Sequence, residues 1–391
     1  MNSMDATLQA QLNLRREEHL YRTRLNVASG CSSTLSVEGR SLINFCSNDY
    51  LGLAGHPDIS LALKQAADIY GTGSGASHLV SGHSVVHREL EEQLAEFTGR
   101  PRALLFSTGY MANIGAINAL IGRRDLVLQD QLNHASLLDG GRLSQADFKR
   151  YKHVDMASLE QRLEQSSAER KLIVTDGVFS MDGNLAPLRE ISALAEKHRA
   201  WLMVDDAHGV GVLGQQGGGL VEQLNMTVEQ VPVLVGTLGK SFGTFGAFVA
   251  GSEALIETLI QFSRSYIYTT ALPPAIAAAT LASLKIVREE TWRRDKLGHL
   301  IARFRCGAEQ IGLQLAESNT PIQPVLINND EKVMQVGQQL RSAGFLVGAI
   351  RPPTVPVGTG RLRITFSADH SEEQVDQLIA ALDSLNLSAP I

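Results

Sequence analysis

Short continuous apolar runs alternate with amphipathic helical patterns between about residues 100 and 250, and this alternation constrains the fold most strongly. The runs are "ALLF" (103–106), "LVL" (126–128), "KLIVT" (171–175), "WLMV" (201–204) and "VPVLV" (231–235). Strands that are apolar throughout are buried on both faces, as in a parallel sheet covered by helices on both sides. The sequence therefore predicts an α/β fold with a large, mostly parallel sheet.

The regions on either side of this alternation predict smaller units. A long helical stretch from about Pro273 to Gln310 precedes short strands around "PVLI", "FLVGAI" and "RLRITF", which favours a second, smaller α+β domain. The first 45 residues combine a helical arm with a short strand, "LINF", and are too few to stand alone. We predict an arm over 1–45, a large domain over 46–285 and a small domain over 286–391.

Composition excludes several classes of protein. Apolar residues make up 44% and charged residues 19% of the 391 residues, which is typical of a soluble globular protein. No apolar run approaches the about 20 residues of a membrane span, and the polar N-terminus lacks the apolar core of a signal peptide. Three distant cysteines favour a reducing cytoplasm over a disulfide framework or a thiolate metal site. A net charge of −6 without a long basic block disfavours nucleic acid as a partner.

Polar residues follow each predicted strand of the large sheet. Ligands of open α/β sheets bind beyond the carboxyl ends of the strands, so residues there are candidates for one shared site. In chain order, the candidates are Ser107, Thr108, Gly109, Tyr110, His134, Ser180, Asp205, Asp206, His208, Thr237 and Lys240. Five strand endings of this kind indicate a binding site rather than ordinary turns.

The chemistry of this set points to one cofactor, pyridoxal 5'-phosphate (PLP). Lys240 is a candidate to form a Schiff base, and Asp205 suits pairing with a protonated pyridine nitrogen. The first turn of the helix that opens at Gly109-Tyr110 offers free N–H groups to a phosphate. The glycines of "GTLGKSFGTFGAF" (236–248) are interpreted as making room for the cofactor against the backbone. Further contacts are expected from Ser180 and Thr237 as hydrogen-bonding hydroxyls and from His134 as a stacking ring.

Six segments then resemble, in order, those of the α-oxoamine synthases, which are fold-type I PLP enzymes. They are "NFCSNDYLGL", "GTGSGASHLVSGHSVVHRELEEQLAEF", "TDGVFSMDG", "VDDAHGVGVLG", "GTLGKSFGTFGAF" and "RPPTVPVGTGRLRI". The resemblance covers nearly the whole chain. It implies a transferase that joins an amino acid to an acyl thioester with loss of CO2. The segments "IQPVLI" (322–327) and "AIRPPTVP" (349–356) favour an alanine-using member over glycine-using relatives.

The resemblance also implies a role for individual residues. Lys240 matches the lysine that carries PLP, Asp205 the partner of the pyridine nitrogen, and His208 the donor to the phenolic oxygen. His134 matches the residue that stacks on the ring and touches substrate. Gly109, Tyr110, Ser180 and Thr237 fall on cofactor-binding positions.

Substrate and subunit contacts follow from the same resemblance. Arg363 matches the arginine that holds the amino acid carboxylate, a task that a planar guanidinium fork fits. Arg22 and Thr354 align with substrate-contacting positions, although Arg22 is equally well explained as a solvated residue of a charged helix. Thr269 and Thr270 resemble a segment that reaches the cofactor phosphate of the neighbouring subunit. The implied assembly is a homodimer with shared active sites.

The implied reaction condenses L-alanine with a pimeloyl thioester, with Lys240 as the general base. Whether the acyl group is carried by coenzyme A or by an acyl carrier protein stays open. A relative that uses glycine or serine, such as glycine C-acetyltransferase or 5-aminolevulinate synthase, is the alternative within the family. A non-catalytic protein that keeps the fold is a third alternative, which the intact set of Lys240, Asp205 and His208 disfavours.

Three other motifs resemble known binding motifs, but each lacks a residue or a spacing that the binding motif requires. "GKS" at 239–241 is not a phosphate-binding P-loop, because the required glycine at 234 is Leu234. "GTGSG" (71–75) lacks the spacing of a dinucleotide fingerprint. His83 and His87 are one helical turn apart without a third ligand nearby in sequence, so a helix start is favoured and no metal site is expected. His83, Cys46 and Ala76–His78 depart from the family pattern, which bears on the acyl chain rather than the chemistry.

Overall fold

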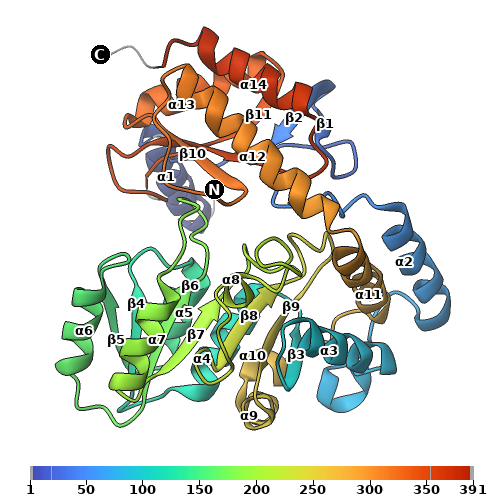
Figure 1. Cartoon of the computed structure of the whole chain (residues 1–391), viewed down its shortest axis with the longest axis vertical. Coiled ribbons are helices and arrows are strands. Elements are labelled where there is room, and N and C mark those ends of the chain that lie inside the picture. Colours follow the sequence, from blue (N-terminus) through green and yellow to red (C-terminus); the bar gives the residue numbers. More distant parts are fainter. Residues whose placement is uncertain (1–2, 19, 353, 388–391) are drawn as a thin grey trace.

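The computed structural model describes residues 3–18, 20–352 and 354–387, which form two β-sheets with their helices (Figure 1). The larger sheet has seven strands in the order β3-β9-β8-β7-β6-β4-β5. Their bounds are β3 Arg102–Phe106, β4 Leu126–Asp130, β5 Asp147–Tyr151, β6 Lys171–Asp176, β7 Trp201–Asp205, β8 Val233–Thr237 and β9 Ala247–Gly251. Only β9 runs against its two neighbours, while the other pairs are parallel. The predicted mostly parallel sheet is confirmed.

Helices cover both faces of this sheet. One face packs on α4 (Gly109–Leu120), α5 (Ala135–Leu143), α9 (Glu253–Phe262) and α10 (Arg264–Ile267). The other packs on α6 (Met156–Glu164), α7 (Leu188–Lys197) and α8 (Leu220–Gln223). Every residue of β4 and of β9 is buried, as expected for strands covered on both sides. The core therefore lies in two layers, one on each side of the sheet.

The smaller sheet joins segments from both ends of the chain, in the order β1-β2-β11-β12-β10. Its strands are β1 Thr34–Val37, β2 Arg40–Phe45, β10 Ile322–Leu326, β11 Phe345–Ile350 and β12 Arg361–Thr365. Strand β2 pairs in parallel with β11, and the remaining pairs are antiparallel. The strand expected in the N-terminal arm is therefore part of the C-terminal sheet, although the domain limits at 45 and 285 stay a prediction.

The long helical stretch predicted from Pro273 to Gln310 is two helices. Helix α11 (Pro274–Glu289) packs on α2 (Pro57–Tyr70) and α3 (Val85–Phe97) beside the large sheet. Helix α12 (Trp292–Gln310) packs on α14 (Glu372–Ser384) in the small domain, where α13 (Asp330–Ser342) covers β11. The break at Glu290-Thr291 lets the chain pass from one domain to the other, as Figure 1 shows.

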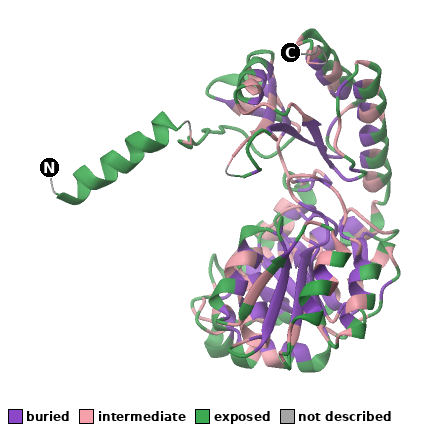
Figure 2. Ribbon diagram, turned by 90° about the vertical axis from the view of Figure 1, so that its left-hand side faces the viewer, coloured by how far each residue is buried: buried purple, intermediate pink, exposed green. Residues whose placement is uncertain are grey.

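Helix α1 (Ser3–Glu17) buries none of its residues and stands away from the rest of the chain (Figure 2). A five-residue π-helical turn, η1 (His78–Gly82), precedes α3. No described helix combines the length and the apolar character that crossing a bilayer requires.

Candidate active site

The polar residues that follow the parallel strands meet at one edge of the large sheet. The register of β6 and β7 places Asp176 directly opposite Asp205. Strand β8 leads into the hairpin loop that carries Lys240 and returns through β9. The small domain borders this edge, because Arg363 of β12 donates through Nε to the Ser180 carbonyl at 2.6 Å. The strand ends therefore converge where the two domains meet.

The amine of Lys240 begins a chain of hydrogen bonds that crosses this site. Lys240 Nζ lies 2.8 Å from His208 Nε2, and His208 Nδ1 lies 2.6 Å from the hydroxyl of Tyr50. The hydroxyl of Tyr50 donates in turn to Asn48 Oδ1 at 3.1 Å. This direction of donation assigns the proton of His208 to Nδ1 and leaves Nε2 as an acceptor for the lysine. Asn48 Oδ1 also accepts from Arg363 at 3.2 Å, so the amine and the guanidinium are linked.

Burial prepares the amine of Lys240 to act as a base or nucleophile. It lowers the pKa of Lys240 to about 8, although the negative charges of Asp205 and Asp176 oppose the shift. Burial and the charges of Lys240 and Arg363 also hold the pKa of His208 well below its ordinary value. The histidine is therefore neutral, and a large fraction of the lysine amine is neutral near pH 8. A neutral amine is the form that attacks a carbonyl or accepts a proton.

Asp205 is buried at the end of β7, and its carboxylate accepts two hydrogen bonds from neighbouring residues. Asn113 Nδ2 donates to Asp205 Oδ2 at 2.6 Å and also approaches Ser136 Oγ at 2.9 Å. Asp205 Oδ1 accepts the N–H of Ala207 at 3.0 Å. Asn113 was not among the predicted residues, although it follows Gly109 by one helical turn and so faces the same site.

His134 caps the N-terminus of α5 and is oriented by two neighbours. Its backbone N–H donates to Asp176 Oδ2 at 2.7 Å, and its ring Nδ1 lies 2.7 Å from Ser136 Oγ. Burial and the nearby charge of Asp205 hold the pKa of Asp176 well above its ordinary value. Asp176 lies in the segment "TDGVFSMDG", and the sequence alone did not indicate its role. The structure shows that it positions the His134 loop.

The N-terminus of α4 points its free backbone groups toward the same edge. Thr108 is the N-cap and accepts the N–H of Met111 at 3.2 Å. The N–H groups of Gly109 and Tyr110 have no acceptor within the described residues. Such a helix start, with two unused donors and a positive dipole end, suits a phosphate group. Tyr110 is itself exposed, and its hydroxyl donates to Asp139.

Two of the glycines in and beside the hairpin loop around Lys240 are packed tightly against other parts of the protein. A Cβ on Gly243 would lie 2.3 Å from the backbone nitrogen of Ala54, and one on Gly236 would lie 2.4 Å from the ring of Phe248. Packing within the protein therefore requires glycine at these two positions, and room for a cofactor stays a prediction. Gly239, beside Lys240, has no such contact, since a Cβ there would lie 3.8 Å from its nearest neighbouring atom.

Arg363 is a buried guanidinium whose charge is not neutralised by any carboxylate within the described residues. Arg361, two residues earlier on β12, is also buried but forms an ion pair with Asp182. Leaving a charge buried and unpaired is costly, so such a residue is expected to meet a charged ligand. The carboxylate of an amino acid matches this requirement.

Five other predicted residues take no part in the chain of hydrogen bonds that begins at Lys240. Arg22 and Thr354 are both exposed, and their neighbours Tyr21 and Pro352 line one cavity of about 680 Å³. The segment with Thr269 and Thr270 lies beside the approach to α4, since Ser107 Oγ donates to the Thr270 carbonyl at 3.4 Å. Thr237 Oγ1 donates within its own loop to the Gly246 carbonyl at 3.2 Å.

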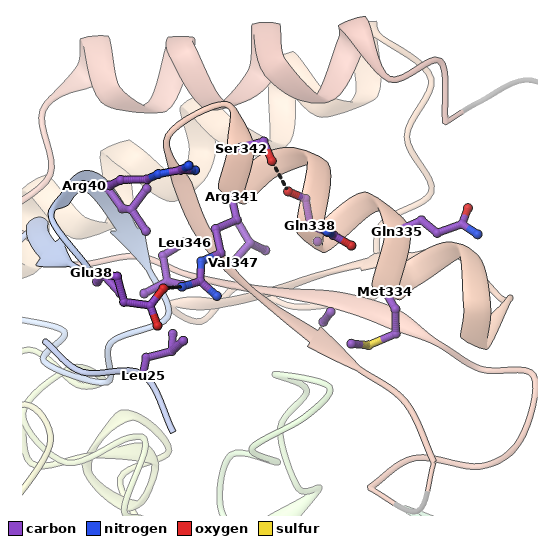
Figure 3. Close-up of a pocket in the computed structure, with 14 residues that line it drawn as sticks. Leu25, Glu38, Arg40, Met334, Gln335, Gln338, Arg341, Ser342, Leu346 and Val347 are labelled. Atoms are coloured by element: carbon purple, nitrogen blue, oxygen red, sulfur yellow. Dashed lines mark hydrogen bonds and ion pairs between the residues drawn. The ribbon is translucent and has the colours of Figure 1, made fainter. Parts of the chain in front are cut away.

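A second groove, of about 740 Å³, lies in the small domain between β1–β2, α13 and β11 (Figure 3). Glu38 and Arg341 form an ion pair across it at 2.9 Å. Its lining includes Leu25, Leu346 and Met334 but none of the predicted site residues. The groove therefore belongs to the arm and the small domain rather than to the edge that carries Lys240.

The residues at this edge fit PLP. A nucleophilic amine of lowered pKa, a buried carboxylate fixed by Asn113, and a helix start with two free N–H groups are brought together. These are the groups that PLP requires for its aldehyde, its pyridine nitrogen and its phosphate. The imidazole of His208 lies beside Lys240, and His134 is hydrogen-bonded to Asp176, which pairs with Asp205 across the strand ends.

Comparison with known proteins agrees with this chemistry. The chain matches the aminotransferase class I and II family over residues 40–382. It is 59% identical to the 8-amino-7-oxononanoate synthase of Saccharophagus degradans over 97% of this chain and 96% of that protein. Identity to the 8-amino-7-oxononanoate synthase of Pseudomonas paraeruginosa is 60%, over 97% of this chain and 94% of that protein.

Solved structures share the fold. The serine palmitoyltransferase of Sphingomonas wittichii superimposes with a TM-score of 0.91 at 33% identity, covering 98% of this chain and 97% of the other. The 8-amino-7-oxononanoate synthase of Francisella tularensis superimposes with a TM-score of 0.78 at 32% identity, covering 88% and 97%. The chain belongs to the aminotransferase class I and II family and, within it, to the 8-amino-7-oxononanoate synthases.

Proposed function

We propose that this chain is a PLP-dependent 8-amino-7-oxononanoate synthase that condenses L-alanine with a pimeloyl thioester in biotin biosynthesis. The observation that carries the proposal is the link from the Lys240 amine through His208, Tyr50 and Asn48 to Arg363. This link joins Lys240, a base of lowered pKa, to Arg363, a buried cation with no carboxylate partner among the described residues. An α-amino acid presents an acidic C–H and a carboxylate to these two groups.

The cofactor would be held by four elements of the chain. Lys240 would bind it covalently, and the N–H groups of Gly109 and Tyr110 would receive its phosphate. Asp205, kept in place by Asn113, would hold a positive charge at the pyridine nitrogen. His134 would stack on the ring. When bound, PLP supplies an electron-withdrawing ring that stabilises negative charge at the α-carbon of the amino acid.

The proton and the carboxylate are handled by this chain's own residues. Arg363 holds the carboxylate of alanine, and this contact orients the α-carbon toward the lysine. Lys240, neutral in part near pH 8, removes the α-proton as the general base. His208 accepts a hydrogen bond from the lysine and so orients its lone pair.

The bonds and charges of the reaction then balance without an oxidant. A C–C bond forms between the α-carbon of alanine and the thioester carbonyl, and the C–S bond breaks to release the thiol. The bond to the alanine carboxyl carbon breaks next, which releases CO2, and a proton returns to the same carbon. Lys240 is the residue we assign to return it.

The test is a crossed assay of thiol release and CO2 release. Alanine, glycine and serine are each offered with pimeloyl and acetyl thioesters of coenzyme A and of acyl carrier protein. We expect turnover to be highest for alanine with a pimeloyl donor. A preference for glycine or serine would assign the chain to another branch, and the 0.91 TM-score with serine palmitoyltransferase makes the serine arm necessary.

Replacing Arg363 with lysine should weaken alanine binding selectively. The substitution keeps the charge but loses the planar fork and the bond to the Ser180 carbonyl. A hydrogen bond to a charged group is worth about 1.5–3 kcal/mol, so we expect KM for alanine to rise by about 10–150-fold. Arg361→Lys is the matched control, because Arg361 is already paired with Asp182 and should leave KM for alanine unchanged. Equal effects of the two variants would contradict the assignment of Arg363.

The remaining contacts belong to the acyl donor and to the assembly. We place the acyl chain along the arm and the loop around Thr354, since Tyr21, next to Arg22, and Pro352 of that loop line one cavity. We further propose a cytoplasmic homodimer in which Thr269 and Thr270 reach the partner's cofactor phosphate. Sedimentation of the holoenzyme should give about twice the 42.3 kDa of one chain.

A further inference from the structure

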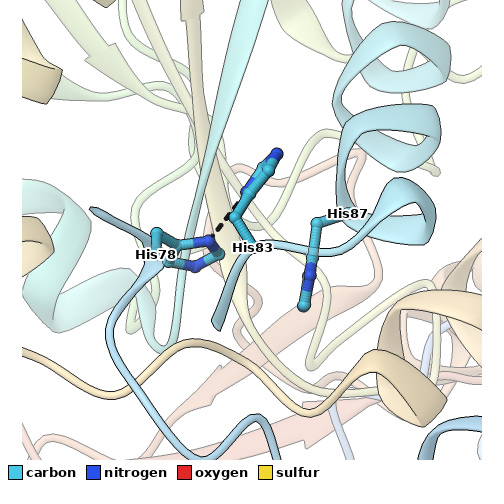
Figure 4. A group of neighbouring side chains, drawn as sticks. All are labelled: His78, His83 and His87. Atoms are coloured by element: carbon cyan, nitrogen blue, oxygen red, sulfur yellow. Dashed lines mark hydrogen bonds between the residues drawn. The ribbon is translucent and has the colours of Figure 1, made fainter. Parts of the chain in front are cut away.

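Three histidines outside the proposed catalytic site lie together at the start of α3 (Figure 4). His78 opens η1, His83 follows it, and His87 lies in the first turn of α3. One ring nitrogen from each lies within 4.8 Å of the other two. The sequence spacing of His83 and His87 lacked a third ligand, and the π-helical turn supplies it by bringing His78 back toward them.

We propose that His78, His83 and His87 bind one divalent transition-metal ion of the zinc type. Three imidazoles with one open position are a common protein site for Zn²⁺, and imidazole also suits Ni²⁺ and Cu²⁺. Zn–N distances of about 2.0–2.1 Å in a tetrahedral site place ligand nitrogens roughly 3.4 Å apart. The observed nitrogens bracket this value, since His78 Nδ1 and His83 Nδ1 are 2.9 Å apart and the largest separation is within 4.8 Å.

The outer partner of one ring already sets the tautomer that a metal requires. His87 Nε2 donates to the Leu272 carbonyl at 2.6 Å, which leaves Nδ1 unprotonated and able to act as a ligand. The carboxylate of Glu91 lies 3.9 Å from His83 Nε2, the ring nitrogen that does not face His78. A backbone carbonyl and a carboxylate behind the ligating rings are the usual second layer of a histidine metal site.

Metal binding replaces three existing hydrogen-bond contacts with metal–ligand bonds. His87 Nδ1 now accepts the N–H of Ser84 at 3.0 Å and lies 2.9 Å from its hydroxyl. The proton shared between His78 and His83 moves to the outer nitrogen of one ring, so no net proton is released. His78 is braced for this role, because its ring stacks on Tyr266 with centroids 5.0 Å apart. Entry is open through His83, whose side chain is 31% exposed.

The site would fasten the segment that contains Thr269 and Thr270. The Leu272 carbonyl accepts from His87, Ala271 N–H donates to the Ala76 carbonyl at 2.9 Å, and Ser77 bridges to Thr270. A metal ion bound here would therefore hold that segment against α3. This consequence rests on the proposed function, whereas the metal site itself does not.

The test uses untagged, chelator-treated holoenzyme titrated with Zn²⁺ alone. Metal content after gel filtration and calorimetry give the stoichiometry and the affinity, and Co²⁺ as a substitute reports coordination by its visible absorption. We expect one ion per chain. His83→Phe, which keeps a ring at a solvent-accessible position, should weaken binding by about 100-fold or more, and Glu91→Gln by about 10–100-fold.

Controls separate this site from other groups that bind zinc. His299→Gln removes an exposed histidine of α12 and should bind Zn²⁺ as the unaltered enzyme does. PLP and the exposed Cys31 and Cys306 are present in every variant, so zinc held by them would survive His83→Phe. Equal zinc content in the unaltered enzyme and His83→Phe would overturn the proposal. Because this readout is metal content, it stands even if the condensation assay fails.

Discussion

Replacing Lys240 with alanine should lower turnover of alanine and a pimeloyl thioester by about 10⁴-fold or more. General base catalysis alone contributes about 10²–10⁴-fold, and the same residue would also hold the cofactor covalently. The amine lies 2.8 Å from His208 and has a pKa of about 8, so its loss removes both functions at once. Steady-state thiol release measures the effect, with cofactor content determined in parallel.

The matched control is Lys285→Ala, which removes an exposed lysine of α11. It should turn over as the unaltered enzyme does. Lys240→Arg tests charge alone, because a guanidinium stays protonated at neutral pH and cannot act as the base. Residual activity in Lys240→Ala within tenfold of the unaltered enzyme would contradict the assignment.

Replacing Asp205 with asparagine should lower kcat by about 10²–10³-fold, the size expected for loss of one preorganised electrostatic partner. Asparagine keeps the shape and can still accept from Asn113, but its single oxygen cannot also accept the N–H of Ala207, and it loses the negative charge that would hold a proton on the pyridine nitrogen. We expect KM for alanine to change little, since Arg363 holds the carboxylate. Steady-state kinetics and the visible absorption of the bound cofactor measure both effects.

Asp206→Asn is the neighbouring control for this variant. Burial raises the pKa of Asp206 to about 8, so its side chain is largely neutral at pH 7, as an amide is. Asp206 Oδ2 accepts the N–H of Leu220 at 2.6 Å and so supports the loop that follows β7. The substitution should change thermal stability more than kcat. A drop in kcat as large as that of Asp205→Asn would contradict the assignment of a catalytic role to Asp205 and a structural role to Asp206.

The large sheet could be predicted well from the sequence because its central strands are apolar without interruption. Strand β5 was missed because its residues, "DFKRY", are mostly polar at the edge of the sheet. Strand β9 was hidden by the glycine-rich hairpin that precedes it. The pairing of β2 with β11 joins residues about 300 positions apart, for example Ile43 with Phe345, and no local pattern reports such a contact.

The site residues that could be predicted are those that follow a strand or lie in a recognisable motif. Lys240, Asp205, His208 and Arg363 each follow or lie on a strand, and the structure brings them to one edge. Asn113 and Tyr50 were missed because their roles depend on packing between distant segments. The third histidine of the α3 cluster escaped notice for a similar reason, since a π-helical turn rather than helical spacing brings it close.

The most direct test of the central claim is borohydride reduction of the holoenzyme followed by peptide mapping. Reduction should fix one pyridoxyl group per chain on the peptide that carries Lys240 and should leave the other lysines unlabelled. The absorption of the bound cofactor should be lost in step with the labelling. A label on another lysine, or no label after PLP has been added, would contradict the assignment of this edge as the cofactor site.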